Sequence, residues 1–319
     1  MSGAATKPVV LVTGADLAPQ ALALLRDFEV VYAGKTPTDS EIAGLCARHD
    51  PTAIIVRYGK VGAAAIEAAP SLKVISKHGA GTDTIDKKAA AARGIDVVAA
   101  AGANAAAVAE HALALLLACA KSVPQLDARM RAGHWDKATH KSVVLRGRTI
   151  GLVGLGAIGV RFARMVDAMG MRVLGFDPYA KGVPPYIERV DDLDALWRAA
   201  DAVSLHCPLT ADNARLVNAD TLGRCKRGVI LVNTARGGLV DEDALLEAVR
   251  SGQVAAAGLD SFAVEPFPAE HAFRTEPRIV LSPHIGGVTA DAYVAMGVAA
   301  AQNVLASLAT GKSLKSVTR

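Results

Sequence analysis

The stretch GLVGLGAIG, residues 151–159, places three glycines inside a run of valine, leucine and isoleucine. Glycine weakens a strand and adds no buried surface, so core packing does not explain the spacing of Gly154, Gly156 and Gly159. An apolar strand precedes the glycines, and an amphipathic helix, AIGVRFARMVDAMG, follows them. This order predicts a dinucleotide-binding turn, in which glycines allow a tight turn, the close approach of a pyrophosphate and close packing of helix on strand.

The strand after this helix ends in Asp177, eighteen residues beyond Gly159. An acidic side chain at this place suits the ribose hydroxyls of an adenosine and would repel a 2′-phosphate. No arginine follows directly, because the sequence continues DPYAKG. The expected cofactor is therefore NAD (NADH) rather than NADP.

Outward from this turn, short β-branched runs alternate with alanine-rich helical patterns along the chain, which is typical of a parallel α/β architecture. The expected strands of a first, five-stranded set are 9–12, 29–32, 53–56, 72–76 and 95–100, with helices such as 38–49 and 84–93 between them. Those of a second, six-stranded set are 149–154, 172–177, 202–206, 229–233, 255–260 and 279–284.

A hinge of small residues near 100–107 leads into a long helical pattern over 104–122, and the chain is helical again from about Asp291. This last helix can pack back on the first set of strands. We therefore expect two doubly wound parallel-sheet domains. They are a discontinuous, flavodoxin-like outer (substrate) domain of residues 1–103 plus 290–319 and an inserted Rossmann NAD-binding domain of residues 104–289. The last segment, 311–319, is expected to fray.

Composition argues against several classes of function. Lys and Arg number 35 and Asp and Glu 31, a net charge of +4, and no basic stripe with aromatic residues appears, so nucleic-acid binding is not expected. The longest apolar stretch, 105–120, contains Glu110 and His111 and is short for a membrane span. The four cysteines form no C-x-x-C pair, and no histidine pair has ligand spacing. The chain is therefore expected to be cytoplasmic, with free thiols and no metal.

Three residues suited to chemistry at a carbonyl follow the last three expected strands: Arg236, Glu265 and His284. Such groups collect beyond the carboxyl ends of parallel strands. A guanidinium can hold the carboxylate and carbonyl oxygen of a 2-keto acid, and an imidazolium can deliver a proton near neutral pH. A paired carboxylate would raise the pKa of that imidazole. We interpret these three residues as the catalytic groups of a hydride transfer.

The chain resembles the D-isomer-specific 2-hydroxyacid dehydrogenases, which include phosphoglycerate, glyoxylate/hydroxypyruvate and D-lactate dehydrogenases. The resemblance covers nearly the full length, through KHGAGTDTID (77–86), NAAAVAEHALALLLA (104–118), the glycine turn, LHCPLT (205–210), NTARGG and SPHIGG. It implies an NAD-dependent oxidoreductase that interconverts a small 2-keto acid and the D-2-hydroxy acid. In that enzyme Arg236 binds the substrate, Glu265 orients and charges His284, and His284 is the proton donor or acceptor.

The same resemblance implies further site residues. Those implied for the cofactor are Val108, Gly154, Gly156, Ala157, Ile158, Gly159, Asp177, His206, Cys207, Pro208, Thr234, Ala235, Arg236, Asp260, His284 and Gly286, with Asp260 beside the nicotinamide amide. Those implied for the substrate are Arg57, Tyr58, His78, Gly79, Ala80 and Gly81. The long helix and the segment through Trp135 resemble the family's dimer-forming arm, so a homodimer is implied.

Several alternatives stay open. A phosphite-type dehydrogenase fits the same motif residues, whereas formate enzymes of this scaffold pair the histidine with glutamine, so Glu265 counts against them. An NAD-sensing binding protein like the C-terminal-binding-protein corepressors shares the fold and the three catalytic residue types. Arg57, Lys60 and Lys77 either contact a second anionic group of the substrate or are solvated surface charges.

The histidines also have alternative roles. His206 suits a structural role as well as cofactor contact, His111 a satisfied core or interface position, and His78 either substrate contact or support of that contact. The other histidines are expected in polar surroundings without a functional role; they are His49, His134, His140 and His271.

Overall fold

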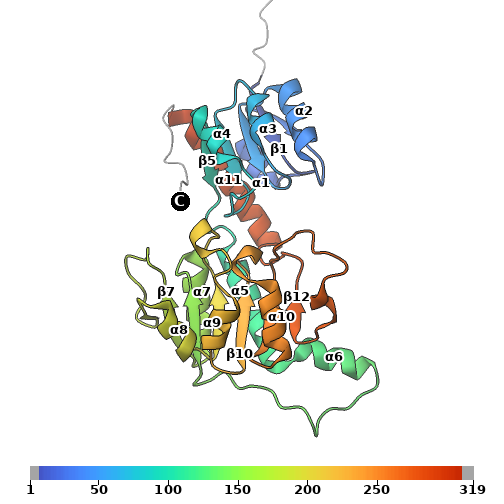
Figure 1. The fold of residues 1–319 in the computed structure, drawn as a ribbon. Coiled ribbons are helices and arrows are strands. Elements are labelled where there is room, and N and C mark those ends of the chain that lie inside the picture. The colour runs from blue at the N-terminus through green and yellow to red at the C-terminus, as the bar shows by residue number, and fades with distance from the viewer. Residues whose placement is uncertain (1–6, 311–319) are drawn as a thin grey trace, which may run out of the picture. The chain divides into compact units, whose positions relative to one another are not determined.

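A computed structural model describes residues 7–310 of the 319-residue chain, so the expected frayed tail, 311–319, lies outside the described residues. The chain forms two compact units (Figure 1). Unit 1 comprises the segment up to Asn104 and the segment from Gly287, and unit 2 comprises Ala105–Gly286. The expected division at residues 103/104 and 289/290 differs from this one by one residue at the first crossing and by three at the second.

Unit 1 contains a five-stranded parallel sheet in the order β2-β1-β3-β4-β5, which is the flavodoxin-like order. Its strands are β1 (Val9–Val12), β2 (Glu29–Tyr32), β3 (Ala53–Val56), β4 (Val74–Lys77) and β5 (Asp96–Ala99). Its helices are α1 (Pro19–Leu24), α2 (Asp39–His49), α3 (Ala63–Glu67), α4 (Lys87–Ala92) and α11 (Ala290–Thr310).

Helices cover both faces of this sheet, as a parallel sheet requires. Leu11 of β1 packs in a core with residues of α2, α3 and α4, whereas Val10 and Val12 pack in a second core with residues of α1 and α11. By length and composition alone α11 could cross a membrane, and so could α5 with α6 across a 60° bend. The packing of α11 on α1 and the sheet accounts for its apolar composition, because Ala300, Ala301 and Val304 are fully buried there.

Unit 2 contains a seven-stranded parallel sheet in the order β12-β11-β10-β9-β6-β7-β8. Its strands are β6 (Thr149–Val153), β7 (Arg172–Phe176), β8 (Glu188–Arg189), β9 (Ala202–Leu205), β10 (Val229–Asn233), β11 (Val254–Leu259) and β12 (Ile279–Leu281). Its α-helices are α5 (Ala105–Lys121), α6 (Val123–Arg131), α7 (Ala157–Ala168), α8 (Leu193–Ala199), α9 (Ala219–Arg224) and α10 (Glu242–Arg250), with 3₁₀ turns η1 (Ala211–Asn213), η2 (Gly237–Leu239) and η3 (Ala272–Thr275).

The order reverses between β6 and β9, so the glycine turn after β6 lies at the switch point where open parallel sheets bind nucleotides. On one face, α5 and α7 pack over a core that contains Leu116 and Phe162. On the other, α8, α9 and α10 pack over a core that contains Leu196, Leu222 and Leu245. The predicted fold class, two doubly wound parallel sheets, is confirmed.

Two details of the second sheet differ from the sequence prediction. Six strands were expected, but the sheet has a seventh, β8, formed by Glu188 and Arg189, which are exposed and carry no apolar pattern. The last strand was expected over 279–284, but β12 ends at Leu281 because the chain turns at the next residues. His284 therefore lies in that turn, with a left-handed φ of 54°.

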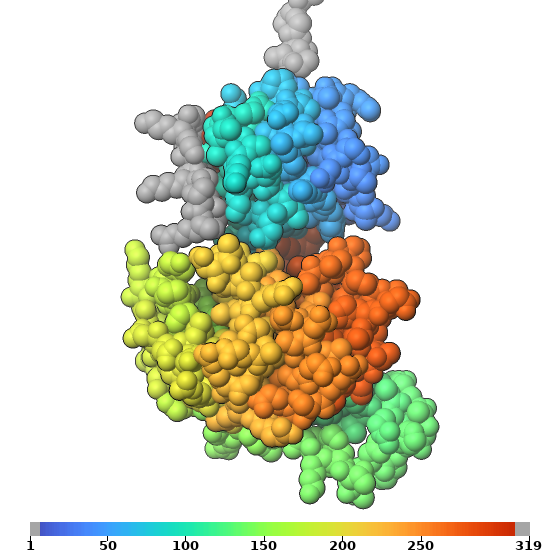
Figure 2. All heavy atoms as spheres, viewed as in Figure 1, coloured from blue at the N-terminus to red at the C-terminus, as the bar shows by residue number. Residues whose placement is uncertain are grey.

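Helix α6 and the segment after it extend from the body of unit 2 (Figure 2). None of the nine residues of α6 is buried. The segment 132–143 that follows leads back to the body, and the backbone N–H of Val143 there donates to the carbonyl oxygen of Ala120. We call residues 123–143 the arm.

Candidate active site

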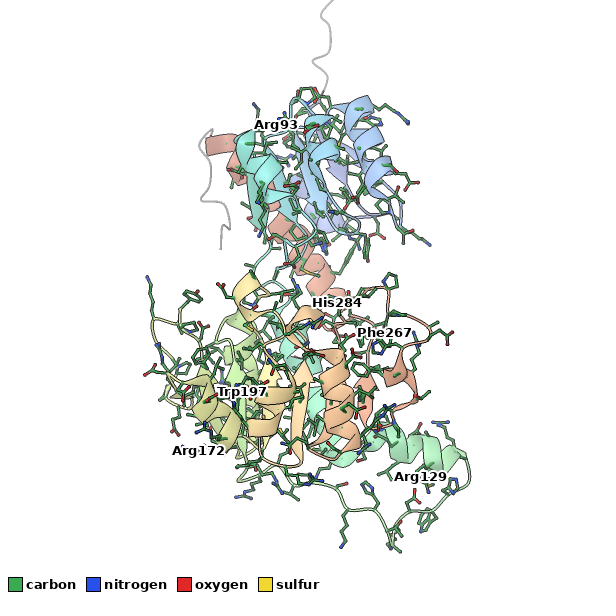
Figure 3. The ribbon with its side chains drawn as sticks, in the orientation of Figure 1. Arg93, Arg129, Arg172, Trp197, Phe267 and His284 are labelled. Carbon is green, nitrogen blue, oxygen red and sulfur yellow. The ribbon has the colours of Figure 1, made fainter. Side chains whose placement is uncertain are left out.

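Three neighbouring strands of unit 2 end beside one another and carry the expected catalytic residues. Strands β10, β11 and β12 are adjacent and parallel, so their carboxyl ends meet at one edge of the sheet. Arg236 follows β10, Glu265 follows β11 and His284 follows β12. Figure 3 shows the side chain of His284 at this edge. The topology thus gathers the three side chains from segments far apart in the sequence.

The fully buried Asn233 shapes the turn that carries Arg236. Its side-chain amide donates to the carbonyl oxygen of Arg236 over 2.8 Å, and its side-chain oxygen accepts from the backbone N–H of Ala235 over 3.0 Å. The guanidinium Nη1 donates to the carbonyl oxygen of Ala235 over 2.7 Å. These bonds hold the turn tightly, and Arg236 is half-buried in it.

The turns that carry Arg236 and Glu265 are in backbone contact. A Cβ on Gly237 would collide with the carbonyl group of Phe262, so only glycine allows this approach. Glu265 returns to the same place, because its Oε1 accepts from the backbone N–H of Phe262 over 3.0 Å. A movement of one turn therefore displaces the other.

The carboxylate of Asp260 organises the turn that carries His284. It is 2% exposed and accepts hydrogen bonds from Ser282 Oγ (2.6 Å) and from the backbone N–H groups of Ile285 (2.9 Å) and Gly286 (2.7 Å). Burial raises the pKa of Asp260, but these bonds and one from His111 outweigh burial and leave the pKa below its usual value. Asp260 is therefore an ionised anchor for the left-handed turn, a conformation that is strained for histidine.

His284 and Glu265 form a hydrogen-bonded pair, with Nδ1 2.7 Å from Oε2. The hydrogen bond to Glu265 raises the pKa of His284, although partial burial and the charge of Arg236 oppose this shift. Burial raises the pKa of Glu265, but the bonds from His284 and from the Phe262 N–H outweigh it and leave the pKa below its usual value. Because the ionised carboxylate only accepts, Nδ1 carries a proton and Nε2 is the nitrogen that gains or loses one.

This arrangement can bind an anion and move a proton. Arg236 supplies a permanent positive charge that acts on both members of the pair. His284 has a side chain 48% exposed, so its Nε2 is accessible for proton transfer. Among residues 7–310, no group of three or more His, Cys, Asp or Glu side chains could hold a metal ion.

The glycine turn follows β6 at the switch point. Gly154 has a φ of 99° and lies against the backbone of His206 and Cys207, and a Cβ on Gly159 would collide with the carbonyl oxygen of Gly154. Gly156 differs, because no other atom lies within 4 Å of where its Cβ would be. The protein's own packing thus does not require glycine at 156, but a ligand that approaches this backbone would.

The surroundings of the turn also fit a dinucleotide. Gly156 begins α7 without a side-chain cap, which leaves helix N–H groups available for a phosphate. Asp177 accepts from the backbone N–H groups of Leu155 (2.9 Å) and Tyr179 (2.8 Å), which fixes its carboxylate at this turn. Thr234 Oγ1 is buried and has no hydrogen-bond partner, so it is a candidate for a bond to a ligand.

Most of the expected cofactor residues follow the carboxyl ends of strands in this one sheet. Ala157 and Ile158 begin α7, Cys207 and Pro208 follow β9, and Ala235 and Gly286 lie in the turns of Arg236 and His284. Val108 lies instead on α5, where it is 6% exposed. Asp260, expected beside the nicotinamide amide, directs its carboxylate into the His284 turn. His111 donates to or accepts from Ser282 Oγ over 2.8 Å, so it is a satisfied, half-buried histidine.

The expected substrate residues lie in unit 1, after the adjacent strands β3 and β4. The Arg57 guanidinium pairs with Asp16 and lies 5.3 Å from the ring centroid of Tyr58 and 4.9 Å from that of Tyr293. Lys77 donates to the carbonyl oxygen of Arg57 over 3.1 Å. Arg57 and Lys77 are therefore engaged within unit 1, and Lys60 has no such contact printed for it among the hydrogen bonds of the described residues.

His78 precedes the glycine-rich segment of Gly79, Ala80 and Gly81. It is 9% exposed, and its Nε2 is buried without a partner. Burial lowers the pKa of His78 to about 4, so the ring is neutral at pH 7. A neutral, unpartnered nitrogen suits a hydrogen bond to a ligand or to water.

The expectation of polar surroundings is wrong for His271. Its ring lies 4.7 Å from that of Phe267 and 4.5 Å from that of Phe273, and its Nε2 lies 3.2 Å from Oε2 of Glu242. The phenylalanines on either side of it in FPAEHAF were the available signal. The pairing of Asp16 with Arg57 was also missed, because a separation of 41 residues leaves no local pattern.

Residues 113–286 match the family model described as "D-isomer specific 2-hydroxyacid dehydrogenase, NAD binding domain". The chain belongs to this family. A D-3-phosphoglycerate dehydrogenase of Mycobacterium leprae is 41% identical over 306 residues, which are 95% of this chain and 57% of that protein. A hydroxypyruvate reductase of Thermotoga maritima is 41% identical over 259 residues, which are 80% of this chain and 84% of that protein.

Among solved structures, the TT0316 protein from Thermus thermophilus has a TM-score of 0.87 and 37% identity to this 2-hydroxyacid dehydrogenase family member, and the match covers 97% of this chain and 99% of that one. The chain spans little more than half the length of the phosphoglycerate dehydrogenases it matches. The predicted family is confirmed, and unit 2 contains its NAD-binding domain.

His206 generates a prediction for this family member's stability. The ring packs on Phe162 at 5.1 Å, its Nε2 lies 2.9 Å from Ser204 Oγ, and its buried Nδ1 has no partner. Burial lowers the pKa of His206 to about 3, whereas an unfolded chain has a histidine pKa near 6.5. The unfolded state therefore binds more protons between these values, and stability falls as the pH is lowered from 6.5 toward 3.

The variant His206→Gln removes this titration and keeps an amide near Ser204. Between pH 7 and pH 5, without nucleotide, the unfolding free energy of the unsubstituted protein should fall by about 2 kcal/mol more than that of the variant. Urea titrations at both pH values measure this difference. Equal losses in the two proteins would show that His206 does not carry the effect.

Proposed function

We propose that this protein is an NAD-dependent oxidoreductase that interconverts a small 2-keto acid and the corresponding D-2-hydroxy acid. The observation that carries the proposal is the 2.7 Å pair of His284 Nδ1 and Glu265 Oε2, on strand ends next to the one that carries Arg236. Family membership supports the same reaction class. Gly156, open to a ligand, and Asp177, fixed at the glycine turn, support NAD as the cofactor.

Each of the three residues has one task in this proposal. Bound NADH supplies the hydride to the carbonyl carbon, or NAD accepts it in the reverse direction. Arg236 binds the carboxylate and carbonyl oxygen of the keto acid through its planar guanidinium. His284 donates the proton on Nε2 to the carbonyl oxygen during reduction and accepts one during oxidation. Glu265 keeps Nδ1 protonated and stabilises the imidazolium.

Further parts of the proposal come from the family resemblance. The unit 1 residues Arg57, Tyr58 and His78, with the backbone N–H groups of Gly79, Ala80 and Gly81, bind the substrate. A cytoplasmic location is supported by four free cysteines in the described chain. We include no nucleic acid or membrane partner.

The direct test measures NADH consumption with pyruvate, glyoxylate, hydroxypyruvate, phosphohydroxypyruvate and branched 2-keto acids. At least one should be reduced to the D-hydroxy acid, and His284→Asn should lower kcat at least about 100-fold because a general acid contributes that much. NADH binding by the variant serves as the control for folding. NADH binding without turnover of any keto acid would favour an NAD-sensing binding protein, and turnover of phosphite alone a phosphite-type dehydrogenase.

The pH dependence of keto-acid reduction tests the pairing of Glu265 with His284. Reduction needs protonated His284, so kcat/KM should be highest below the pKa of His284 and fall as the pH rises through it. Because Glu265 raises this pKa, Glu265→Gln should move the fall to lower pH. Profiles of kcat/KM between pH 5.5 and 9 measure the midpoint. An unchanged midpoint in the variant would separate Glu265 from this role.

We also propose that the arm pairs two copies of the chain into a homodimer. Val123, Met130 and Trp135 are 56%, 52% and 75% exposed, a large apolar surface for one extended segment. A hollow of about 520 Å³ lies between the arm and the body of unit 2, with Leu126 and Ile230 among the residues that line it. A second copy that covers this surface would bury these side chains.

Analytical ultracentrifugation tests the dimer. The unsubstituted protein should sediment near twice its 32.8 kDa chain mass, whereas Met130→Glu combined with Trp135→Glu should sediment as a monomer because each buried charge is costly. The pair Arg161→Glu and Arg164→Glu, on α7 outside the arm, is the control and should leave the mass unchanged. A dimer that survives both arm substitutions would contradict this interface.

A further inference from the structure

We propose that Glu242 and His271 are positioning residues that hold the loop of Glu265 and so set the pKa of His284. This inference rests on the proposed function, because it concerns the same proton-transfer pair. Glu242 is the first residue of α10, and His271 lies just before η3. Neither side chain touches His284 in any contact the structure gives, so both act through the backbone between them.

The loop of Glu265 has few attachments of its own. Residues 263–266 are all exposed, and the side chain of Glu265 is 36% exposed. A loop that lies in solvent gains no packing energy from these residues, so its position depends on hydrogen bonds and on its flanks. The carboxylate must nevertheless stay 2.7 Å from Nδ1 of His284 to charge it.

Glu242 supplies one attachment. Its Oε1 accepts from the backbone N–H of Ala263 over 2.9 Å, and its side chain is only 16% exposed. Ala263 lies between Phe262, whose N–H binds Glu265, and Glu265 itself. Two carboxylates thus hold two successive N–H groups of one loop. Glu242 also ties this loop to α10, which follows the Arg236 turn directly.

His271 fixes Glu242. Its Nδ1 accepts from the backbone N–H of Phe273 over 3.2 Å, so the ring proton is on Nε2, which lies 3.2 Å from Oε2 of Glu242. The carboxylate therefore faces an N–H donor at each oxygen. Glutamine in its place would turn its own NH₂ group toward one of these donors and could satisfy only one.

Aromatic packing connects His271 to the start of the loop. Phe267, labelled in Figure 3, lies 4.7 Å from the ring of His271 and 4.2 Å from that of Phe262. Arg274 lies 5.0 Å above Phe267 and donates to its carbonyl oxygen over 3.1 Å. The loop is thus held at one flank by this stack and near its middle by Glu242.

The test measures the pKa of His284 by NMR titration of histidine-labelled protein without substrate, so it does not depend on turnover. Glu265→Gln identifies the His284 signal and gives the full downward shift. Glu242→Gln should lower the pKa in the same direction by at least a third of that shift. Glu247→Gln is the matched control on the same helix, since Glu247 is 76% exposed and pairs only with Arg250, and it should leave the pKa unchanged.

His271→Phe is the second variant, because it retains a ring in the aromatic stack and removes only the Nε2–H. It should lower the pKa of His284 too, and it carries the comparison if Glu242→Gln does not fold. Where a keto-acid substrate is found, both variants should lower kcat more than KM and shift the pH profile of reduction downward. NADH affinity should stay within about twofold.

Three results would overturn the inference. They are a His284 pKa that is unchanged in both variants, an equal shift in Glu247→Gln, or a lowered melting temperature with an unchanged pKa, which would indicate a structural role only. If the pKa shifts as expected but no keto acid is reduced, the positioning role holds and the proposed reaction fails. The two proposals are thus tested separately.

Discussion

The buried carboxylate of Asp260 is the constraint on which the candidate active site depends. It lies at the end of β11 and binds Ser282 and two N–H groups of the next strand's exit, while His111 reaches the same oxygen from α5 at 3.3 Å. Hydrogen bonds to an ionised group are stronger than those between neutral groups, and they weaken little with salt when the group is buried. They therefore offset the strain of a left-handed histidine. Without this anchor, His284 would have no reason to leave the strand in the direction of Glu265.

A second constraint comes from strand order. Because β10, β11 and β12 are consecutive in both the sequence and the sheet, each connection returns to the same edge, and three short turns bring a guanidinium, a carboxylate and an imidazole together. The Gly237–Phe262 contact then fixes the spacing between two of these turns at the level of the backbone. Side-chain geometry in the site is thus set by main-chain packing, which is stiffer than side-chain contacts alone.

Local patterns in the sequence were sufficient for the fold class, the glycine turn and the residues at the strand ends. Those features depend on apolar periodicity and on residue types at fixed offsets, which a single chain displays directly. Features that depend on contacts between distant segments were not predictable. Examples are the exposed strand β8, the pairing of Asp16 with Arg57, and the environment of His271, whose polar neighbours in sequence conceal aromatic neighbours in space. The direction of the Asp260 carboxylate belongs to this second group as well.

The return of α11 to unit 1 has a consequence for how the chain matures on the ribosome. Strands β1 to β5 are synthesised first, but the helix that covers one face of their sheet comes after all of unit 2. Domains generally fold as units during synthesis, at about 5–20 residues per second. The inserted unit is therefore complete while Val10, Val12 and Val98 still await Ala300, Ala301 and Val304. For roughly ten seconds or longer an apolar sheet face is left uncovered in the nascent chain, which makes the earliest-made part of the protein the last to be finished and a natural client for chaperones.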